Sequence, residues 1–399
     1  MKKSLVYLQS GGPTSVINSS LYGAIKEAKR NQNIDKILGS LNGIEGLISN
    51  DLIDLRKEEE ETIELLKQTP GAILGSSRFK LPSDFDNDIY QSILETIRKH
   101  DIGYVIVNGG NDSMDTCNKL SKLFALKKLD VNVVGVPKTV DNDLAFTDHC
   151  NGFGSAAKYV INTVKSICVD ASCYKKGKVI VIEIMGRNAG WLTASIDLLP
   201  FPYRPDLIFL PEVKLDLSSL LDEVNSLYRK KGYLVIAFSE GVSLFSSYKD
   251  EQVDSFGHNK LEGSGEEIAK LIHKKLNLPT RSIILSIPQR ADPFLISKVD
   301  QEEAINCGKY AVMGALNNEN GKMVAINRIS SKPYKVSFEY VDVSKIANVE
   351  KKIPSSFMKD SYEMSNDFKE YLSPLIEGET SIKFKNGIFE SASLKKIKV

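Results

Sequence analysis

The sequence predicts an α/β fold built on mainly parallel sheets. Short runs rich in valine and isoleucine recur along the chain, and each ends in a glycine or polar turn that usually leads into a helix-like stretch. The runs are continuously apolar rather than alternating, which is typical of strands buried on both faces of a parallel sheet. The 399 residues are enough for two domains. We therefore expect two doubly wound α/β domains, with the active site in the cleft between them.

Six strands are expected, and each carries its unusual residues at its carboxyl end. Ligands bind at that end in open parallel sheets, so the six following loops should converge on one cleft. The first two strands lead into glycine pairs, the third into a lysine with two aspartates, and the fourth and sixth into arginines. The strands with their loops are SLVYLQSGG at 4–12, YVIVNGGNDS at 104–113, VNVVGVPKTVDND at 131–143, KVIVIEIMGRNAG at 178–190, YLVIAFSEG at 233–241 and RSIILSIPQR at 281–290.

Charge and cysteine content exclude several classes of function. With 52 basic and 51 acidic residues the formal net charge is +1, so no overall field would draw the protein to nucleic acid or to an anionic membrane. The five cysteines are too few and too scattered for a disulfide framework or a zinc site, which favours a reducing cytosol. No stretch approaches the roughly 20 apolar residues of a membrane span. We expect a cytoplasmic protein with no membrane or nucleic-acid partner.

Two glycine pairs, Gly11-Gly12 and Gly109-Gly110, follow the first and second expected strands. Paired glycines let the backbone approach a ligand closely, and free amides at a helix start favour phosphate. One such pair fits a simple strand-to-helix turn, but two are what a polyphosphate clamp needs. Asp112 is the odd residue there, since like charges ~4 Å apart repel by about 4 kcal/mol at an effective dielectric of ~20. It either holds a metal, excludes a negative group or caps the helix.

The segment PKTVDND at 137–143 places a lysine and two carboxylates directly after a buried strand. A surface turn would also contain proline, asparagine and aspartate. Phosphoryl transfer requires this set, however, because Lys138 can neutralise the transferring group while Asp141 orients a hydroxyl and accepts its proton. Arginine forks suited to a second phosphate stand in other loops, at Arg78, Arg187, Arg281 and Arg290.

These motifs together resemble the phosphofructokinase family, and more closely its pyrophosphate-dependent branch. The resemblance runs in order through GGPTSVIN, GAILGSSRF, NGGNDS, PKTVDND, TDHCNGFGSAAKY, EIMGRNAGW and SEG, then weakly through IPQR and ANVEKKIP, to about residue 355. It implies a magnesium-dependent, reversible transfer of phosphoryl from pyrophosphate to the 1-hydroxyl of fructose 6-phosphate in glycolysis. The products would be fructose 1,6-bisphosphate and phosphate.

Two residues match the family's markers for the phosphoryl donor. Asp112 stands where ATP-dependent members have glycine, and it resembles the residue that occupies the space of the ATP α-phosphate. Lys138 likewise replaces a glycine of the ATP-dependent members. Both markers favour pyrophosphate. The pyrophosphate site implied by the resemblance consists of Gly11, Gly12, Arg78, Gly110, Asp112, Ser113 and Lys138.

The same resemblance implies the acceptor and metal sites. Asp141 looks like the proton acceptor for the sugar 1-hydroxyl, and the implied catalytic set is Asp141, Lys138, Thr139 and Arg187. The implied sugar-phosphate contacts are Thr139, Asp141, Met185, Gly186, Arg187, Glu240, Ile287 and Arg290, with Lys178 and Arg281 reaching across from a neighbouring subunit. A homodimer or homotetramer is therefore implied. Magnesium, the implied cofactor, would lie at Asn111 and Asp143.

Three positions depart from the family pattern. Asn111 replaces the usual aspartate at the metal position, so magnesium would be held chiefly by pyrophosphate and water. Tyr22 and Lys26 stand where bacterial ATP-dependent enzymes carry effector-site arginines, so no allosteric control is expected. Ile287 falls where the family has histidine or tyrosine, which leaves sedoheptulose 7-phosphate open as the acceptor.

Two alternatives to this function stay open at the level of sequence. An ATP-dependent 6-phosphofructokinase or related sugar-phosphate kinase is opposed by Asp112 and Lys138. A non-catalytic regulatory subunit of the same fold is opposed by the joint presence of Lys138, Asp141 and Arg187.

The expected domains divide the chain into discontinuous parts. The larger α/β domain, on the pyrophosphate side, should comprise residues 1–140 and about 255–310. The smaller one, on the sugar-phosphate side, should comprise about 141–254 and about 311–330. From about 331 to 399 the chain changes character, and we expect a C-terminal extension packed on the core.

Overall fold

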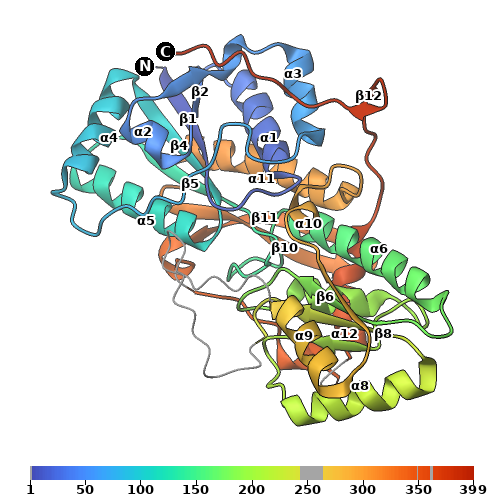
Figure 1. Ribbon diagram of the computed structural model, residues 1–399. Helices are drawn as coiled ribbons and strands as arrows, with labels where there is room; N and C mark the ends of the chain where they lie inside the picture. Colours follow the sequence, from blue (N-terminus) through green and yellow to red (C-terminus); the bar gives the residue numbers. More distant parts are fainter. Residues whose placement is uncertain (1, 243–263, 348, 360–362) are drawn as a thin grey trace. The chain divides into compact units, whose positions relative to one another are not determined.

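The computed structural model describes residues 2–242, 264–347, 349–359 and 363–399, which form two compact units (Figure 1). Unit 1 contains Met1–Ser155, Arg290–Glu350 and Gly378–Val399. Unit 2 contains Ala156–Gln289 and Lys351–Glu377. Each unit is built on its own mainly parallel sheet, so the predicted fold class, two α/β domains, is confirmed.

The sheet of unit 1 has seven strands in the order β11-β10-β5-β4-β1-β2-β3. Its five inner strands pair in parallel, and β11 and β3 pair antiparallel at the two edges. Parallel neighbours need crossover connections, and helices supply them in the chain. The strands are β1 (Lys3–Gln9), β2 (Ile34–Ser40), β3 (Leu52–Asp54), β4 (Ile102–Gly109), β5 (Asn132–Pro137), β10 (Lys322–Ser331) and β11 (Tyr334–Asp342).

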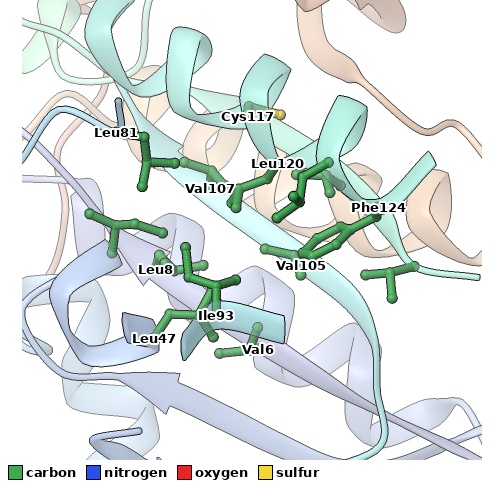
Figure 2. Close-up of a cluster of buried hydrophobic side chains, with 14 of the residues drawn as sticks. Val6, Leu8, Leu47, Leu81, Ile93, Val105, Val107, Cys117, Leu120 and Phe124 are labelled. Carbon is green, nitrogen blue, oxygen red and sulfur yellow. The ribbon is translucent and has the colours of Figure 1, made fainter. Parts of the chain in front are cut away.

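Both faces of this sheet are buried, which explains the continuous apolar runs. On one face Leu8 and Val105 pack against α4 and α5 side chains such as Phe124 (Figure 2). On the other face their neighbours Leu5 and Tyr7 pack against α1 and α11. Each such side chain contributes roughly 1.5–3 kcal/mol when fully buried. The helices of unit 1 are α1 (Ile17–Arg30), α2 (Ile44–Ile48), α3 (Glu60–Leu65), α4 (Asp88–Lys99), α5 (Asn111–Leu126) and α11 (Lys298–Leu316).

Unit 2 has a four-stranded parallel sheet in the order β7-β8-β6-β9. Its strands are β6 (Val179–Ile184), β7 (Leu207–Phe209), β8 (Leu234–Ser239) and β9 (Thr280–Ile284). The helices that lie wholly or partly in unit 2 are α6 (Phe153–Ser172), α7 (Trp191–Ser195), α8 (Leu217–Lys231), α9 (Ser264–Leu276), α10 (Pro288–Ala291) and α12 (Asn366–Leu372). Trp191 packs against Phe357, Phe368 and Tyr371, and this aromatic contact fastens residues 351–377 to the unit. No described helix is both long and apolar enough to cross a membrane.

The division of the chain differs in extent from the expected domains. Residues 311–330 form the end of α11 and most of β10, and they lie in unit 1 because β10 pairs with β5. Residues 264–289 lie in unit 2 because β9 pairs with β6. The expected boundary near residue 255 lies outside the described residues.

The expected C-terminal extension is three separate pieces. β11 completes the sheet of unit 1, and residues 351–377 belong to unit 2. Residues 378–399 return to unit 1 through a short hairpin of β12 (Phe384–Lys385) and β13 (Ile388–Phe389). The chain then runs along β3, where the Asp54 amide donates to the Ile397 carbonyl at 2.9 Å. These pieces therefore form part of the two units rather than one added layer.

Candidate active site

Three predicted loops of unit 1 meet at one edge of its sheet. β5, β4 and β1 are adjacent and parallel, so the segments that follow them begin side by side. These segments carry Gly11-Gly12, Gly110–Ser113 and Lys138–Asp143. The Lys138 amide donates to the Gly109 carbonyl at 3.2 Å, which continues the β4–β5 pairing into the loops. The structure thus brings together most of the predicted pyrophosphate-binding residues.

Lys138 is buried against the first glycine pair. Lys138 is 3% exposed, and its Nζ donates to the Gly12 carbonyl at 2.7 Å. A Cβ atom placed on Gly11 would lie 3.3 Å from that Nζ. A Cβ atom placed on Gly12 would lie 2.9 Å from Nη1 of Arg290. The two glycines therefore leave room for two cationic groups beside the backbone.

The electrostatics of this cluster favour an anion. Burial lowers the pKa of Lys138 to about 8, the negative fields of Asp141 and Asp143 oppose that shift, and the charge of Arg290 adds to it. A bound phosphate would stabilise the charged ammonium and restore its higher pKa. Arg290 was expected at the sugar 6-phosphate, but its guanidinium lies beside Gly12 of the first glycine pair. Its role toward the sugar stays a prediction.

Arg78 is carried by a loop that lies along the same glycine pair. The Gly11 amide donates to the Ser77 carbonyl at 3.2 Å. The Ser76 hydroxyl donates to the Gly11 carbonyl at 2.6 Å. Arg78 itself is exposed.

Asp112 lies in the first turn of α5 and does not cap it. Gly110 occupies the N-cap position, and its carbonyl accepts from the amides of Ser113 and Met114 at 3.0 Å each. The Asp112 carboxylate instead forms an ion pair with Lys80, with Oδ1 and Nζ 3.1 Å apart. Sequence reasoning missed Lys80, although it stands only two residues after Arg78. The helix-cap alternative for Asp112 is therefore wrong.

The turn that carries Asp141 is closed by its own side chains. The Asp141 amide donates to the Thr139 hydroxyl at 3.1 Å. Asn142 has a left-handed backbone with φ of 54°, which asparagine tolerates better than most residues. Its buried Oδ1 accepts from the Cys150 amide at 3.1 Å. Thr139 and Asp141 are thus held together, as the predicted catalytic set requires.

The protein offers few ligands for a metal at this edge. The Asn111 side-chain nitrogen donates to the Val349 carbonyl at 2.8 Å, and the acceptor atom of this side chain is its Oδ1. Among the described residues, no group of three or more histidine, cysteine, aspartate or glutamate side chains could hold a metal ion. This sparse oxygen set fits magnesium, which commonly keeps several waters and substrate oxygens as ligands. Asn111 and Asp143 stay predicted ligands.

In unit 2 the predicted sugar-phosphate residues gather at the carboxyl ends of β6 and β8. The Gly186 amide lies 3.4 Å from Glu240 Oε1, and Arg187 Nε lies 3.9 Å from the same oxygen. Gly186 has φ of 135°, which L side chains rarely adopt. The Met185 amide donates to Gln289 Oε1 at 3.1 Å. Sequence reasoning missed Gln289, whose signal was its place in IPQR beside Arg290.

Lys178 and Arg281 lie at the other end of this sheet. Lys178 precedes β6, and Arg281 pairs with Ile180 near the start of that strand. Both side chains belong to exposed residues. The fold of one chain therefore does not bring them to Arg187 and Glu240. Their predicted contribution to a neighbouring subunit is compatible with this position and stays a prediction. Ile287 is 58% exposed at the end of the segment after β9.

The family model described as phosphofructokinase matches residues 4–318. The chain belongs to the phosphofructokinase family. It is 38% identical to a pyrophosphate–fructose 6-phosphate 1-phosphotransferase of Halomonas elongata, over 98% of this chain and 96% of the relative. It is also 38% identical to the enzyme of the same name from Xanthomonas campestris pv. campestris, over 99% of this chain and 97% of the relative.

A solved phosphofructokinase structure agrees with the sequence relatives. The crystal structure of the pyrophosphate-dependent phosphofructokinase from Nitrosospira multiformis matches with a TM-score of 0.90 at 37% identity, and the match covers 100% of this chain and 98% of that one. The predicted membership of the pyrophosphate-dependent branch of the phosphofructokinases is therefore confirmed.

Proposed function

We propose that this phosphofructokinase transfers a phosphoryl group from pyrophosphate to the 1-hydroxyl of fructose 6-phosphate. The observation that carries the proposal is the buried Lys138 ammonium, which donates to the Gly12 carbonyl. By the family resemblance, ATP-dependent members have glycine in place of Lys138. A lysine fixed there places a charge beside the donor phosphates. The products are fructose 1,6-bisphosphate and inorganic phosphate.

The reaction needs a base, a cationic clamp and a path for the leaving group. The sugar 1-hydroxyl attacks one phosphorus of pyrophosphate, its proton passes to the Asp141 carboxylate, and the bridging P–O bond breaks as phosphate leaves. Lys138, Arg290 and Arg78 neutralise charge on the phosphate oxygens. Thr139 accepts the Asp141 amide and so holds the base in its turn. A positioned base of this kind contributes ~10²–10⁴ in rate.

Asp112 selects pyrophosphate over ATP. The family resemblance implies that the Asp112 carboxylate, in the first turn of α5, would occupy the space of a nucleotide α-phosphate. The repulsion would be between about 1 and 4 kcal/mol at ~4 Å, depending on the local dielectric. Lys80 offsets part of this charge through the ion pair described above. Because Asp112 is partly exposed, the lower part of that range applies, together with the volume that the side chain fills.

The remaining features of the proposal concern the metal, the assembly and the setting. Magnesium would neutralise charge on pyrophosphate, with Asn111 Oδ1 and Asp143 as the protein oxygens near it. We propose a homodimer or homotetramer in which Lys178 and Arg281 complete the sugar-phosphate site of a neighbouring subunit. The bonds made and broken are similar, which supports a reversible reaction. We also propose a cytoplasmic role in glycolysis.

One assay tests the proposed function. Purified protein is given magnesium and fructose 6-phosphate, with either pyrophosphate or ATP as the donor, and fructose 1,6-bisphosphate is measured. Pyrophosphate should support turnover and ATP should not. Equal rates with ATP would favour the kinase alternative, and no turnover with either donor would favour a regulatory subunit. Sedoheptulose 7-phosphate as a second acceptor tests the breadth permitted by Ile287.

A further inference from the structure

A buried histidine lies between two carboxylates in unit 1, next to the turn that carries Asp141. The His149 side chain is 2% exposed. Its Nδ1 lies 2.8 Å from Asp148 Oδ1, and its Nε2 lies 2.6 Å from Glu303 Oε2. Carboxylates accept on both sides, so both ring nitrogens donate and the imidazole is protonated. The proposed reaction uses neither this charge nor its partners.

The two carboxylates are themselves tied to other elements. Arg328 on β10 donates from Nε and Nη2 to Asp148 Oδ1, at 3.1 and 2.9 Å. Tyr334 on β11 donates its hydroxyl to Glu303 Oε1 at 2.6 Å. Charges of alternating sign thus run from β10 through residues 148–149 to α11. Burial alone would lower the pKa of His149, but Glu303 and Asp148 raise it to about 9, so the ring stays charged at neutral pH.

The backbone beside His149 is bonded directly to the catalytic turn. Lys138 and Asn151 form a parallel bridge, and the Asn151 side-chain nitrogen donates to the Pro137 carbonyl at 2.8 Å. The Cys150 amide donates to Asn142 Oδ1 at 3.1 Å. Asn142 follows Asp141 and holds the left-handed turn after it. The 138–142 turn is therefore held in place by its backbone bridge and hydrogen bonds to residues 147–151.

We propose that His149 is a positioning residue for Asp141. Its ion pair with Glu303 fastens residues 147–151 to α11, and its ion pair with Asp148 orients the carboxylate that Arg328 holds on β10, so that both contacts fix the turn that holds the base. This inference rests on the proposed function, in which Asp141 accepts the proton of the acceptor hydroxyl. A displacement of about 1 Å in a reacting group can cost ~10²-fold in rate. The ion pairs act on the orientation of Asp141 and make no contact with substrate, so kcat should depend on them more than either Michaelis constant does.

The test compares His149→Gln with wild type and with a matched control. The control is His100→Gln, the same change at a buried histidine of unit 1 whose Nε2 lies 2.6 Å from Asn50 Oδ1. With saturating pyrophosphate and fructose 6-phosphate, His149→Gln should lose roughly 10- to 100-fold in kcat, while both Michaelis constants stay within about threefold. His100→Gln should keep kcat within about twofold, even if its melting temperature falls.

A double variant supplies the rescue that a general loss of stability would not give. In His149→Gln the Glu303 carboxylate keeps Tyr334 but loses its cation, so it stays buried and uncompensated. His149→Gln combined with Glu303→Gln replaces the charged pair by two neutral amides. We expect the double variant to recover kcat by about tenfold over His149→Gln, because the coupled pair acts as a unit. A double variant as slow as the sum of the single losses would contradict this coupling.

Hydrogen exchange provides a readout that does not depend on turnover. The peptide covering residues 138–151, without substrate, should exchange at least about tenfold faster in His149→Gln than in wild type or His100→Gln. If wild type fails to use pyrophosphate and fructose 6-phosphate, the proposed function is wrong, and the exchange rates alone then decide whether His149 fastens the turn. Unchanged exchange, or kcat within twofold of wild type, overturns the positioning role.

A milder variant keeps the inference testable if His149→Gln does not fold. Tyr334→Phe removes only the hydroxyl that holds Glu303 Oε1. It should lower kcat by about two- to fivefold, in keeping with the loss of one hydrogen bond, and speed exchange in the same peptide. A folded Tyr334→Phe enzyme with wild-type kcat and exchange overturns the proposal in that case.

Discussion

The buried ammonium of Lys138 predicts an alkaline limit to pyrophosphate capture. Its pKa of about 8 lies below the ordinary value of 10.5 because burial disfavours the charged form. The protonated fraction is therefore about 0.9 at pH 7, one-half at pH 8, about 0.1 at pH 9 and about 0.01 at pH 10. Since only the ammonium can clamp the donor, kcat/KM for pyrophosphate should fall about fivefold from pH 8 to 9 and about tenfold from pH 9 to 10.

The assay measures kcat/KM for pyrophosphate from pH 6 to 10 in wild type and in Lys138→Met. That ratio reports on the free enzyme, in which no bound phosphate has yet restored the pKa of Lys138. Ionisation of pyrophosphate itself affects both enzymes equally and cancels when wild type is divided by the variant. The quotient should be large and flat below pH 7, pass a one-proton midpoint near 8 and fall to about one-hundredth of its low-pH value at pH 10.

Two outcomes would refute the reasoning about Lys138. A quotient that stays flat to pH 10 would mean that the ammonium keeps its charge despite burial. A quotient near one throughout would mean that Lys138 does not bind the donor. Lys80→Met serves as a control, since it removes a different lysine of the same edge and must leave the midpoint in place.

Three further predictions concern the base, the donor and regulation. Asp141→Asn should lose ~10²–10⁴ in kcat with little change in sugar affinity, and a variant within tenfold of wild type would remove Asp141 from the mechanism. Asp112→Gly should give measurable turnover with ATP, because the volume that the carboxylate fills becomes available and Lys80 is released to meet an α-phosphate. If ATP stays inert while pyrophosphate activity persists, Asp112 does not select the phosphoryl donor. Saturation curves should stay hyperbolic with ADP or phosphoenolpyruvate, since Lys26 pairs with Glu60 and Glu64 and Tyr22 donates to Glu64; a sigmoidal curve shifted by ADP would overturn this.

Local patterns predicted the strands and loops of the site because each signal lies within a few residues. The buried runs that end at Gly11, Gly109 and Lys138 are strand and loop together, and parallel pairing then places their ends at one edge. The same reasoning recovered β6, β8 and β9 in unit 2. Residue roles carried by the family resemblance add chemistry that periodicity alone does not supply.

Contacts between distant parts of the chain could not be predicted in this way. Nothing in the local pattern of GSSRFK states that Lys80 meets Asp112 on α5, and nothing in TDHCNGF states that His149 meets Glu303, which is 154 residues away. β10 was not among the expected strands, so its pairing with β5 was missed as well. β10 pairs with β5 only at Lys322 and Met323, and it is continuously buried only over residues 323–326, so its apolar run is short and its signal weak.

The pairing of β10 with β5 has a consequence for a chain emerging from the ribosome. The first continuous part of unit 1 ends at Ser155, but β5 obtains its second neighbour only when residues from Lys322 onward have been made. At roughly 5–20 residues per second this interval lasts on the order of ten to thirty seconds. During this interval β5 is the open edge of the nascent sheet, and its backbone hydrogen-bonding groups on that side have no partner strand. Every residue of β5 is buried in the finished fold, so this edge is also apolar. Chaperone capture, or aggregation when chaperones are scarce, is therefore expected at this stage of synthesis, and a fragment ending at Ser155 should be insoluble when expressed alone.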